Sequence, residues 1–413
     1  MAIIKPFAAL RPKPEYAELI AAPPYDVLSS DEAREMVKDN PHSFLRVDKS
    51  EVDLDQSINI YDDRVYTKAA SNLNWLAQNA MVQDGKPCLY IYKLIMNGIE
   101  QTGLVACTSV DGYLSGAIKK HELTREDKER DRTRHIDMTN ANTGPIFLAY
   151  RHMDNPEIRA KIASLTSSNP AVYDFTAEDG IKHLVWVIDN EDDIKGLIEC
   201  FAVLPVLYIA DGHHRNASAV NIAKKRRESD LDPNAEFNYT LSVIFPDEEL
   251  RILDYNRMVK DLNGLSSDEF LSKVTERFIV SSSEAPVKPG KLNEFGMYMA
   301  KKWYRLELRE TDRIQKNKTD ALDVAILQNT ILSPLLGIGD PRTDKRIDFV
   351  GGMRGLSELE KRVDSGEMTV AFSMYPTSMS QLMAIADAGE IMPPKSTWFE
   401  PKLRSGLFVH WLK

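Results

Sequence analysis

Apolar runs of strand length alternate with polar stretches of helical period along this chain, which predicts an α/β fold with mixed sheets. Residues 88–94 and 103–108 are apolar runs on either side of a turn, so we expect a β-hairpin there. Helices are predicted over 62–79, over 320–332 and after Ser29 or Ser30, either of which can cap the segment that follows. The remaining strand candidates are residues 41–47, 144–150, 182–188, 203–208 and 304–308.

The order of these elements predicts three regions. Residues 1–112 form an N-terminal α/β region, and residues 113–245 form a central region with a highly charged helix and several strands. Residues 246–413 form a C-terminal α/β region that ends in a proline-rich tail. No internal repeat or low-complexity linker separates these regions in the sequence.

Composition restricts the class of protein. The 413 residues are 43% hydrophobic, which is enough for a sizeable core. Lysine and arginine number 52 and aspartate and glutamate 62, so the net charge is −10 and a nucleic-acid partner is disfavoured. The sequence does not indicate an oligomeric state.

The cysteines and the N-terminus indicate a cytoplasmic protein. Cys88, Cys107 and Cys200 lie far apart and form no CxxC pair, so neither a disulfide framework nor a structural zinc site is indicated. The first residues lack the apolar core of a signal peptide, and no run of about eighteen apolar residues occurs, so we expect no membrane partner.

The most informative stretch is residues 209–218, where an apolar strand leads through Asp211 and Gly212 into a helical sequence. At such a strand-to-helix turn, backbone N–H groups and the positive end of the helix dipole point at one place. Arg215 adds donors suited to phosphate oxygens, and Asp211 adds a carboxylate for a metal or a hydroxyl. This turn therefore predicts phosphate chemistry. The plain alternative is a capping aspartate followed by two surface histidines.

A second candidate is the pair His121-Glu122, which precedes the charged helix at 126–135. Most of the charge on that helix is expected to be solvated. The residue four after His121 is Arg125, so the HExxH zinc motif is excluded. A glutamate in this position remains a candidate general base, provided that it reaches the hydroxyl it deprotonates.

The third candidate is the C-terminal stretch 392–407, in which Lys395, Lys402 and Arg404 lie among prolines and hydroxyl side chains. Cations on backbone held rigid by proline can surround an anionic substrate. The alternative is an ordered tail that packs its aromatic residues against the core while its cations face water.

Together these motifs resemble the ParB/sulfiredoxin superfamily in order and type. The resemblance rests on Glu122, on Arg132 in the following helix, on the Pro145-Ile146-Phe147 strand and on the 211–215 turn. Within that superfamily the Asp-Gly-His-His-Arg form looks like the free L-serine kinases. The segments 23–27, 40–45 and 392–397 look like the larger relatives known as domain of unknown function 1015, so the resemblance covers nearly the whole chain.

The resemblance implies a fold, an activity and a role for each matching residue. Residues 113–245 become a ParB/sulfiredoxin-like catalytic core with N-terminal and C-terminal α/β extensions, and the activity becomes phosphorylation of free L-serine to O-phospho-L-serine. Glu122 becomes the general base, and Asp211 assists it or holds Mg²⁺. The donor phosphates are bound by Gly212, His213, His214 and Arg215, with the tail cations Lys395, Lys402 and Arg404. The serine contacts are Ser43, His121, Thr124 and Arg132.

The phosphoryl donor and the function class stay open at this point. Members of the larger type are reported to use inorganic pyrophosphate, and the chain has neither a Walker loop nor a kinase glycine loop, so pyrophosphate is favoured over ATP or ADP. His213 stands where a sulfiredoxin has its catalytic cysteine, so that activity is disfavoured. The alternatives are a non-catalytic ParB-like nucleotide-binding regulator and a metal-dependent hydrolase that uses His213 and His214.

Overall fold

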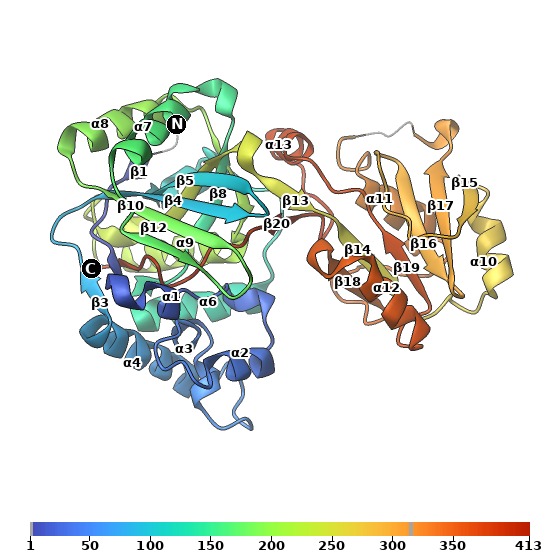
Figure 1. Ribbon diagram of the computed structural model, residues 1–413, viewed down its shortest axis with the longest axis horizontal. Coiled ribbons are helices and arrows are strands. Elements are labelled where there is room, and N and C mark those ends of the chain that lie inside the picture. The colour runs from blue at the N-terminus through green and yellow to red at the C-terminus, as the bar shows by residue number, and fades with distance from the viewer. Residues whose placement is uncertain (1–2, 314–316) are drawn as a thin grey trace. The chain divides into compact units, whose positions relative to one another are not determined.

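The computed structural model describes residues 3–313 and 317–413. The chain forms two compact units (Figure 1). Unit 1 comprises Met1–Leu250 together with Pro401–Lys413, and unit 2 comprises Arg251–Glu400. The C-terminal segment therefore returns to the unit in which the chain begins.

Unit 1 is built on a mixed sheet that has nine strands in the described part of the chain. Their order is β6-β11-β8-β12-β5-β4-β10-β9, and β1 pairs with β5. β8 runs parallel to β12 and β6 parallel to β11, whereas the other pairs are antiparallel. The strands are β1 (Ile4–Lys5), β4 (Leu89–Met96), β5 (Ile99–Ser109), β6 (Ile118–Lys119), β8 (Ile146–Tyr150), β9 (Tyr173–Thr176), β10 (Lys182–Ile188), β11 (Leu207–Asp211) and β12 (Tyr239–Pro246).

Helices cover both faces of this sheet (Figure 1). On one face α7 (Glu157–Ser168) and α8 (Glu191–Ala202) bury Ile158, Ile162 and Phe201 against the apolar side chains of the strands. On the other face α6 (Glu126–Thr139) packs between α9 (His213–Arg226) and α4 (Asp63–Asn79). The start of α9 and the loop before α6 are the two segments that carry the sequence candidates.

Short elements complete unit 1 and hold its C-terminal segment. β21 (His410–Trp411) pairs with β7 (Ala141–Asn142), and single bridges join Leu10 to Val409 and Ala22 to Ser405. The other elements are β2 (Leu10–Pro12), β3 (Met81–Gln83), α1 (Ala17–Ile20), α2 (Ser30–Val37), α3 (Leu45–Asp48) and α5 (Val110–Leu114).

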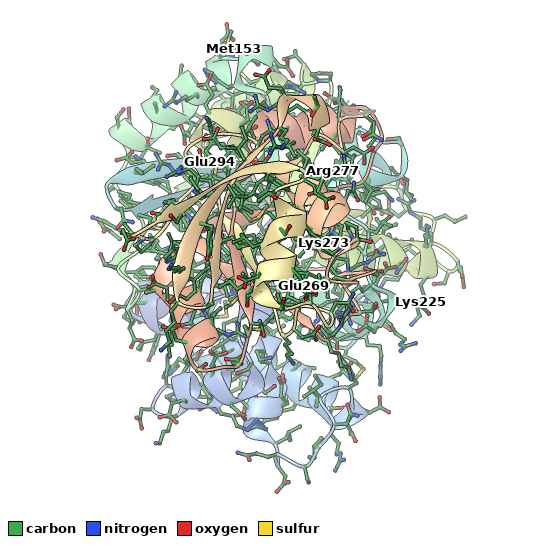
Figure 2. All side chains as sticks on the ribbon, turned by 90° about the vertical axis from the view of Figure 1, so that its right-hand side faces the viewer. Met153, Lys225, Glu269, Lys273, Arg277 and Glu294 are labelled. Atoms are coloured by element: carbon green, nitrogen blue, oxygen red, sulfur yellow. The ribbon has the colours of Figure 1, made fainter. Side chains whose placement is uncertain are left out.

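Unit 2 has its own antiparallel sheet, in the order β15-β17-β16-β19-β14-β18. A capping box starts α10: the Ser266 side chain accepts from the Glu269 N–H, and the Glu269 carboxylate accepts from the Ser266 N–H. Figure 2 shows Glu269 and Lys273 on this helix, both with exposed side chains. The elements are β13 (Arg251–Leu253), β14 (Tyr255–Val259), α10 (Ser267–Val274), β15 (Phe278–Ser283), β16 (Glu294–Met299), β17 (Lys302–Leu308), α11 (Asp323–Leu327), β18 (Ile347–Gly351), α12 (Gly355–Asp364), β19 (Val370–Ser373), α13 (Met379–Asp387) and β20 (Trp398–Glu400).

The mixed α/β class and several local predictions are confirmed. β4 and β5 form the predicted hairpin, and α4 covers nearly the whole predicted range 62–79. Ser29 caps α2 through a capping box with Glu32. The strands predicted at 144–150, 182–188 and 304–308 correspond to β8, β10 and β17. The helix predicted at 320–332 is α11 followed by a π-helical turn over Gln328–Leu332.

Two strand predictions are wrong in a way that the burial pattern explains. Residues 41–47 lead into helix α3, because Phe44, Leu45 and Val47 are all buried, which fits a helical face and not the alternation of a strand. The predicted strand 203–208 begins only at Leu207, since Val203 follows the end of α8 and is 61% exposed. Short apolar runs do not distinguish a strand from a buried helical turn.

The structure also divides the chain differently from the three predicted regions. The strands β4 and β5, before residue 112, lie in the same sheet as β8, β11 and β12, after it, so residue 112 does not separate two compact units. The boundary predicted near 246 lies close to the observed one at Leu250, but residues Pro401–Lys413 belong to unit 1. Sheet pairing over long sequence separations decides this division, and it leaves no local signal.

Among the described helices, none is long and apolar enough to cross a lipid bilayer.

Asp323 is a buried carboxyl group with a strongly perturbed pKa in unit 2. It is 5% exposed, and its Oδ1 accepts from the Asn293 N–H at 2.9 Å, while within the described residues its Oδ2 has no hydrogen-bond partner. Burial raises the pKa of this carboxyl to about 7, against the opposing effect of the Asn293 N–H. The unfolded chain therefore loses this proton at a lower pH than the folded chain does.

We expect Asp323→Asn to stabilise unit 2 at pH 8, because asparagine keeps the acceptor for Asn293 without a buried charge. A folded pKa raised by three units corresponds to at most about 4 kcal/mol above pH 7, and the difference disappears below about pH 4, where both states are protonated. Calorimetric melting curves of both proteins at pH 8 and pH 5 measure it. A variant with no higher melting temperature at pH 8 contradicts the prediction.

Candidate active site

The predicted strand-to-helix turn is present between β11 and α9. Gly212 has φ +92°, a left-handed conformation that favours glycine, and it is followed directly by the first residue of α9. A Cβ atom at Gly212 would lie 3.2 Å from Nε of Arg215, which folds back over the turn. The first turn of a helix leaves N–H groups without intrahelical acceptors, so this end of α9 can bind an anion.

Asp211 is ion-paired with a residue from the C-terminal segment. Its Oδ2 accepts from Nζ of Lys402 at 2.9 Å, and its Oδ1 accepts from the Gly212 N–H at 2.8 Å. Burial alone raises the pKa of this carboxyl, but the charges of Lys402 and Arg215 and these two hydrogen bonds outweigh it and hold the pKa below its ordinary value. Asp211 is therefore a carboxylate at neutral pH, and Lys402 lies at the turn.

The two histidines of the turn hold the loop that contains Glu122. Nε2 of His213 accepts from the His121 N–H at 3.5 Å, and Nε2 of His214 accepts from the Arg125 N–H at 3.0 Å. Burial lowers the pKa of both imidazoles, so their nitrogens accept hydrogen bonds at neutral pH. Both rings thus contact the 121–125 loop, an orientation that the sequence did not indicate.

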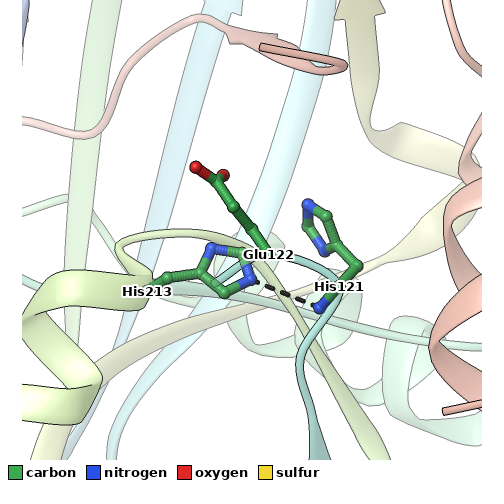
Figure 3. A group of neighbouring side chains, drawn as sticks. All are labelled: His121, Glu122 and His213. Carbon is green, nitrogen blue, oxygen red and sulfur yellow. Dashed lines mark hydrogen bonds between the residues drawn. The ribbon is translucent and has the colours of Figure 1, made fainter. Parts of the chain in front are cut away.

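His121, Glu122 and His213 form a cluster at this place (Figure 3). A nitrogen of each imidazole and a carboxylate oxygen of Glu122 all lie within 4.8 Å of one another. The His121 ring is 1% exposed and meets the His213 ring edge-on, with centroids 4.5 Å apart. The structure therefore brings the predicted base, Glu122, against the predicted phosphate turn.

Arg132 and Arg215 line a small cavity in unit 1. The cavity is about 20 Å³ in volume, and its other polar walls include Asp48, Thr143 and Tyr25. Arg132 donates from Nε to Asp131 at 2.9 Å and from Nη1 to the Asp48 carbonyl at 3.3 Å, and its guanidinium lies over the Tyr25 ring. Two cationic groups and one carboxylate therefore face a common space.

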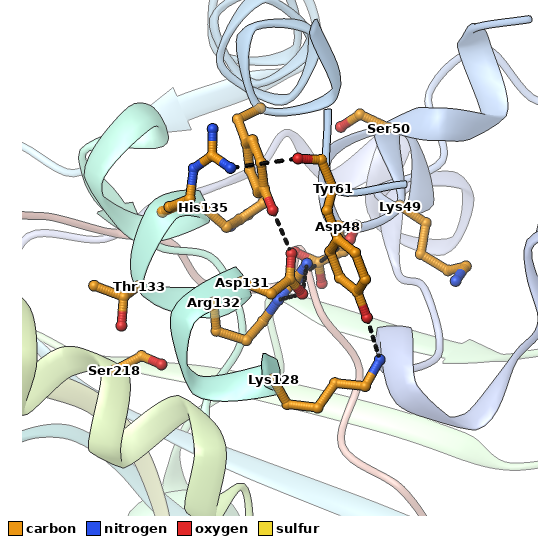
Figure 4. Close-up of polar contacts among 12 residues, drawn as sticks. Asp48, Lys49, Ser50, Tyr61, Lys128, Asp131, Arg132, Thr133, His135 and Ser218 are labelled. Carbon is orange, nitrogen blue, oxygen red and sulfur yellow. Dashed lines mark hydrogen bonds and ion pairs between the residues drawn. The ribbon is translucent and has the colours of Figure 1, made fainter. Parts of the chain in front are cut away.

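Polar groups on the inner side of α6 are buried, although most of the charged side chains of this helix are exposed or only partly buried, as predicted. Asp131, labelled in Figure 4, is 7% exposed and accepts from the Tyr66 hydroxyl at 2.8 Å. Nε2 of His135 pairs with the Val47 carbonyl at 3.0 Å. Charge on a helix is usually solvated, but here α4 and α3 cover the side of α6 that carries these groups.

The other predicted contacts lie in different surroundings. Oγ1 of Thr124 donates to Glu129 at 2.7 Å. Ser43 and Arg404 line a separate pocket of about 490 Å³, in which Arg404 is paired with Asp179 and also contacts His183. Lys395 belongs to unit 2, where its ammonium lies 5.6 Å from the centroid of the Tyr255 ring. Of the three tail cations, only Lys402 has a recorded contact with the turn among the described residues.

Sequence reasoning missed two polar residues of the Arg132 cavity. Oγ1 of Thr143 donates to Oδ1 of Asp48 at 2.7 Å, and both side chains are buried. Asp48 follows the segment 41–47 that was predicted to be a strand, and Thr143 precedes Gly144-Pro145 before β8, so neither stood in a recognisable motif.

Fold and site define a mixed α/β protein with a strand–turn–helix motif at Gly212 and a glutamate on the neighbouring loop. The chain belongs to the family described as protein of unknown function (DUF1015), whose model matches residues 4–325. No curated protein matches the chain.

Solved structures give weaker likenesses. A free serine kinase in complex with AMP is 13% identical, with 78% of this chain and 92% of that chain covered and a TM-score of 0.36. A conserved hypothetical protein from Pyrococcus furiosus is 14% identical, with 75% of this chain and 95% of that chain covered and a TM-score of 0.33. SbnI with a C-terminal truncation, from Staphylococcus aureus, is 10% identical, with 74% of this chain and 87% of that chain covered and a TM-score of 0.38.

We expect Lys402→Met to lower the free energy of unfolding, because it leaves the Asp211 carboxylate without its cation. Since the two side chains are 17% and 28% exposed, solvent screens part of the loss, and we expect about 1–2 kcal/mol at pH 7. Urea unfolding of the single variant and of Asp211→Asn/Lys402→Met measures it. The double variant should recover most of the loss, and a strictly additive loss would show that the pair is not coupled.

Proposed function

We propose that this protein is a small-molecule kinase that phosphorylates the hydroxyl of free L-serine, with inorganic pyrophosphate as the favoured phosphoryl donor. The observation that carries the proposal is the position of Glu122 against the start of α9, where an anion-binding helix terminus and a candidate base share one place. The resemblance of the 211–215 motif to the free L-serine kinases supplies the substrate.

The donor phosphates are assigned to the N–H groups at the start of α9. Arg215 folds over Gly212 and its Nη1 donates to the Pro145 carbonyl at 2.7 Å, which keeps its charge beside the turn. Lys402 adds a second cation through its pair with Asp211. Phosphoryl transfer depends mainly on positioning and on neutralising oxygen charge, and these groups supply both.

Glu122 is assigned as the general base. In the proposed step its carboxylate takes the proton of the serine hydroxyl, the serine oxygen forms a bond to the transferred phosphorus, and the bond from that phosphorus to the bridging oxygen breaks. With pyrophosphate as donor the leaving group is inorganic phosphate. The two histidine hydrogen bonds to the 121–125 loop keep this carboxylate in place, so His213 and His214 act as positioning residues.

Serine recognition is assigned to the cavity between Arg132 and Arg215. A free amino acid needs cations for its carboxylate and an anion for its ammonium, and Asp48 is the carboxylate that lines this cavity. At about 20 Å³ the cavity holds roughly one water, so serine binding requires it to widen. The Tyr25 side chain lines this cavity and directly follows Pro23-Pro24, and it is the group that we expect to move.

Mg²⁺ is proposed to enter together with the donor. Mg²⁺ prefers oxygen ligands and bridges phosphates, where it neutralises charge on the donor oxygens. Both oxygens of Asp211 already accept a hydrogen bond, one of them from a cation, so this carboxylate can share an ion with the phosphates but offers little as a site of its own.

The donor screen tests the proposal directly. Purified protein is incubated with L-serine, Mg²⁺ and pyrophosphate, ATP or ADP in turn, and O-phospho-L-serine is measured by phosphorus NMR. We expect product with pyrophosphate, and reactions with EDTA or without serine serve as controls. Product with a nucleotide only would correct the donor, and no product with any donor contradicts the kinase. Tight nucleotide binding without transfer would instead favour the regulator alternative.

We expect Glu122→Gln to lower kcat by about 10²–10⁴-fold with little change in KM, because glutamine keeps the size of the side chain and cannot take a proton. The matched control is Glu126→Gln, since Glu126 is an exposed glutamate four residues further along. Steady-state phosphoserine formation measures both variants. An unchanged kcat in Glu122→Gln removes this residue from the role of base.

A further inference from the structure

The His121 side chain is a buried polar group with no evident use in the proposed phosphoryl transfer. It is 1% exposed, and neither ring nitrogen makes a well-formed hydrogen bond with any described residue. The Ile209 carbonyl lies near enough to oppose the effect of burial, which lowers the pKa of the imidazole to about 4. A buried polar side chain without a partner costs free energy, so a ligand that it could bind is expected nearby.

Two side chains that could bind a ligand together with His121 lie beside it, namely His213 and Glu122. One nitrogen of His213 and one carboxylate oxygen of Glu122 lie with a His121 nitrogen inside a group whose widest separation is 4.8 Å. Figure 3 shows the Glu122 and His121 side chains next to the His213 ring. Ligand atoms about 2.0–2.1 Å from a tetrahedral ion are roughly 3.3 Å apart, so the widest pair of this group must approach by about 1.5 Å to hold such an ion, and Glu122 is the half-buried member of the three.

We propose that His121, Glu122 and His213 form a binding site for a divalent transition-metal ion of the zinc class, separate from the Mg²⁺ that accompanies the donor. Two imidazoles and one carboxylate, with a fourth position open, are the donor set of many zinc sites. Imidazole nitrogen favours zinc, cobalt, nickel and copper over magnesium, which prefers oxygen.

Occupation of this site has a consequence for the chemistry, which rests on the proposed function. A divalent metal ion coordinated by Glu122 withdraws electron density from this carboxylate and so lowers the basicity that it needs to accept the serine proton. Zinc bound here is therefore an inhibitor of the kinase, acting on the base and not on the donor phosphates. The site couples the activity of the enzyme to the concentration of free transition metal.

The test is a spectroscopic titration that does not depend on catalysis. Tag-free full-length protein is stripped with EDTA, desalted and titrated with Co²⁺, whose visible absorption reports the geometry and number of its ligands. We expect one Co²⁺ per chain, a nitrogen-ligand spectrum and displacement by Zn²⁺ but not by millimolar Mg²⁺. No binding, or binding that Mg²⁺ displaces equally well, overturns the proposal.

Variants locate the site. We expect His121→Gln, His213→Gln and Glu122→Gln each to weaken Co²⁺ binding by about tenfold or more, since removal of a ligand costs at least as much as removal of an outer-shell partner. The matched control is His214→Gln, whose ring nitrogen bonds the Arg125 N–H and lies outside the cluster. Equal affinity in all four variants places the metal elsewhere. If a buried histidine variant fails to fold, the partly exposed Glu122 variant still decides the outcome.

The activity measurement then separates the two proposals. If the protein makes phosphoserine, addition of Zn²⁺ at the concentration that displaces Co²⁺ is expected to stop it. Co²⁺ binding at the three residues without any phosphoserine formation would support the metal site and contradict the kinase. Phosphoserine formation without Co²⁺ binding would support the kinase and contradict the metal site.

Discussion

Two hydrogen bonds from backbone N–H groups to imidazole nitrogens hold the candidate site of this protein together. His213 and His214, adjacent at the start of α9, accept from the two ends of the 121–125 loop, and Glu122 lies between those ends. Each bond requires an unprotonated nitrogen, and burial supplies this by lowering the pKa of both rings. The position of the carboxylate relative to the turn between β11 and α9 depends on this arrangement.

The C-terminal segment supplies a positive charge, that of Lys402, to the turn between β11 and α9. Residues 401–413 cross unit 1 through the bridges at Ala22 and Leu10 and through the pairing of β21 with β7. That path brings Lys402 to Asp211 and keeps the aspartate ionised in a partly buried place. The same segment brings Arg404 to Asp179, so two cations of this segment pair with two different carboxylates.

Local sequence signals predicted much of the fold. The hairpin of β4 and β5, the capped start of α2, helix α4 and the Gly212 turn were all readable, because each depends on residues close together in the chain. The strand predicted at 41–47 was wrong for the opposite reason. Which side of a segment is buried depends on what packs against it, and α3, α4 and α6 pack on one another.

The sequence by itself determined the chemistry available at the site: a glycine with a left-handed φ between strand and helix, a base candidate before a charged helix, and an abundance of cations. Only the tertiary structure decided how these groups are used. In the folded chain the His213 and His214 rings contact the 121–125 loop. Asp48 and Thr143 line the cavity that contains Arg132. His121 lies buried beside Glu122 and His213. The physical reason is that side-chain hydrogen bonds and burial join residues about ninety positions apart, and no local pattern records such contacts.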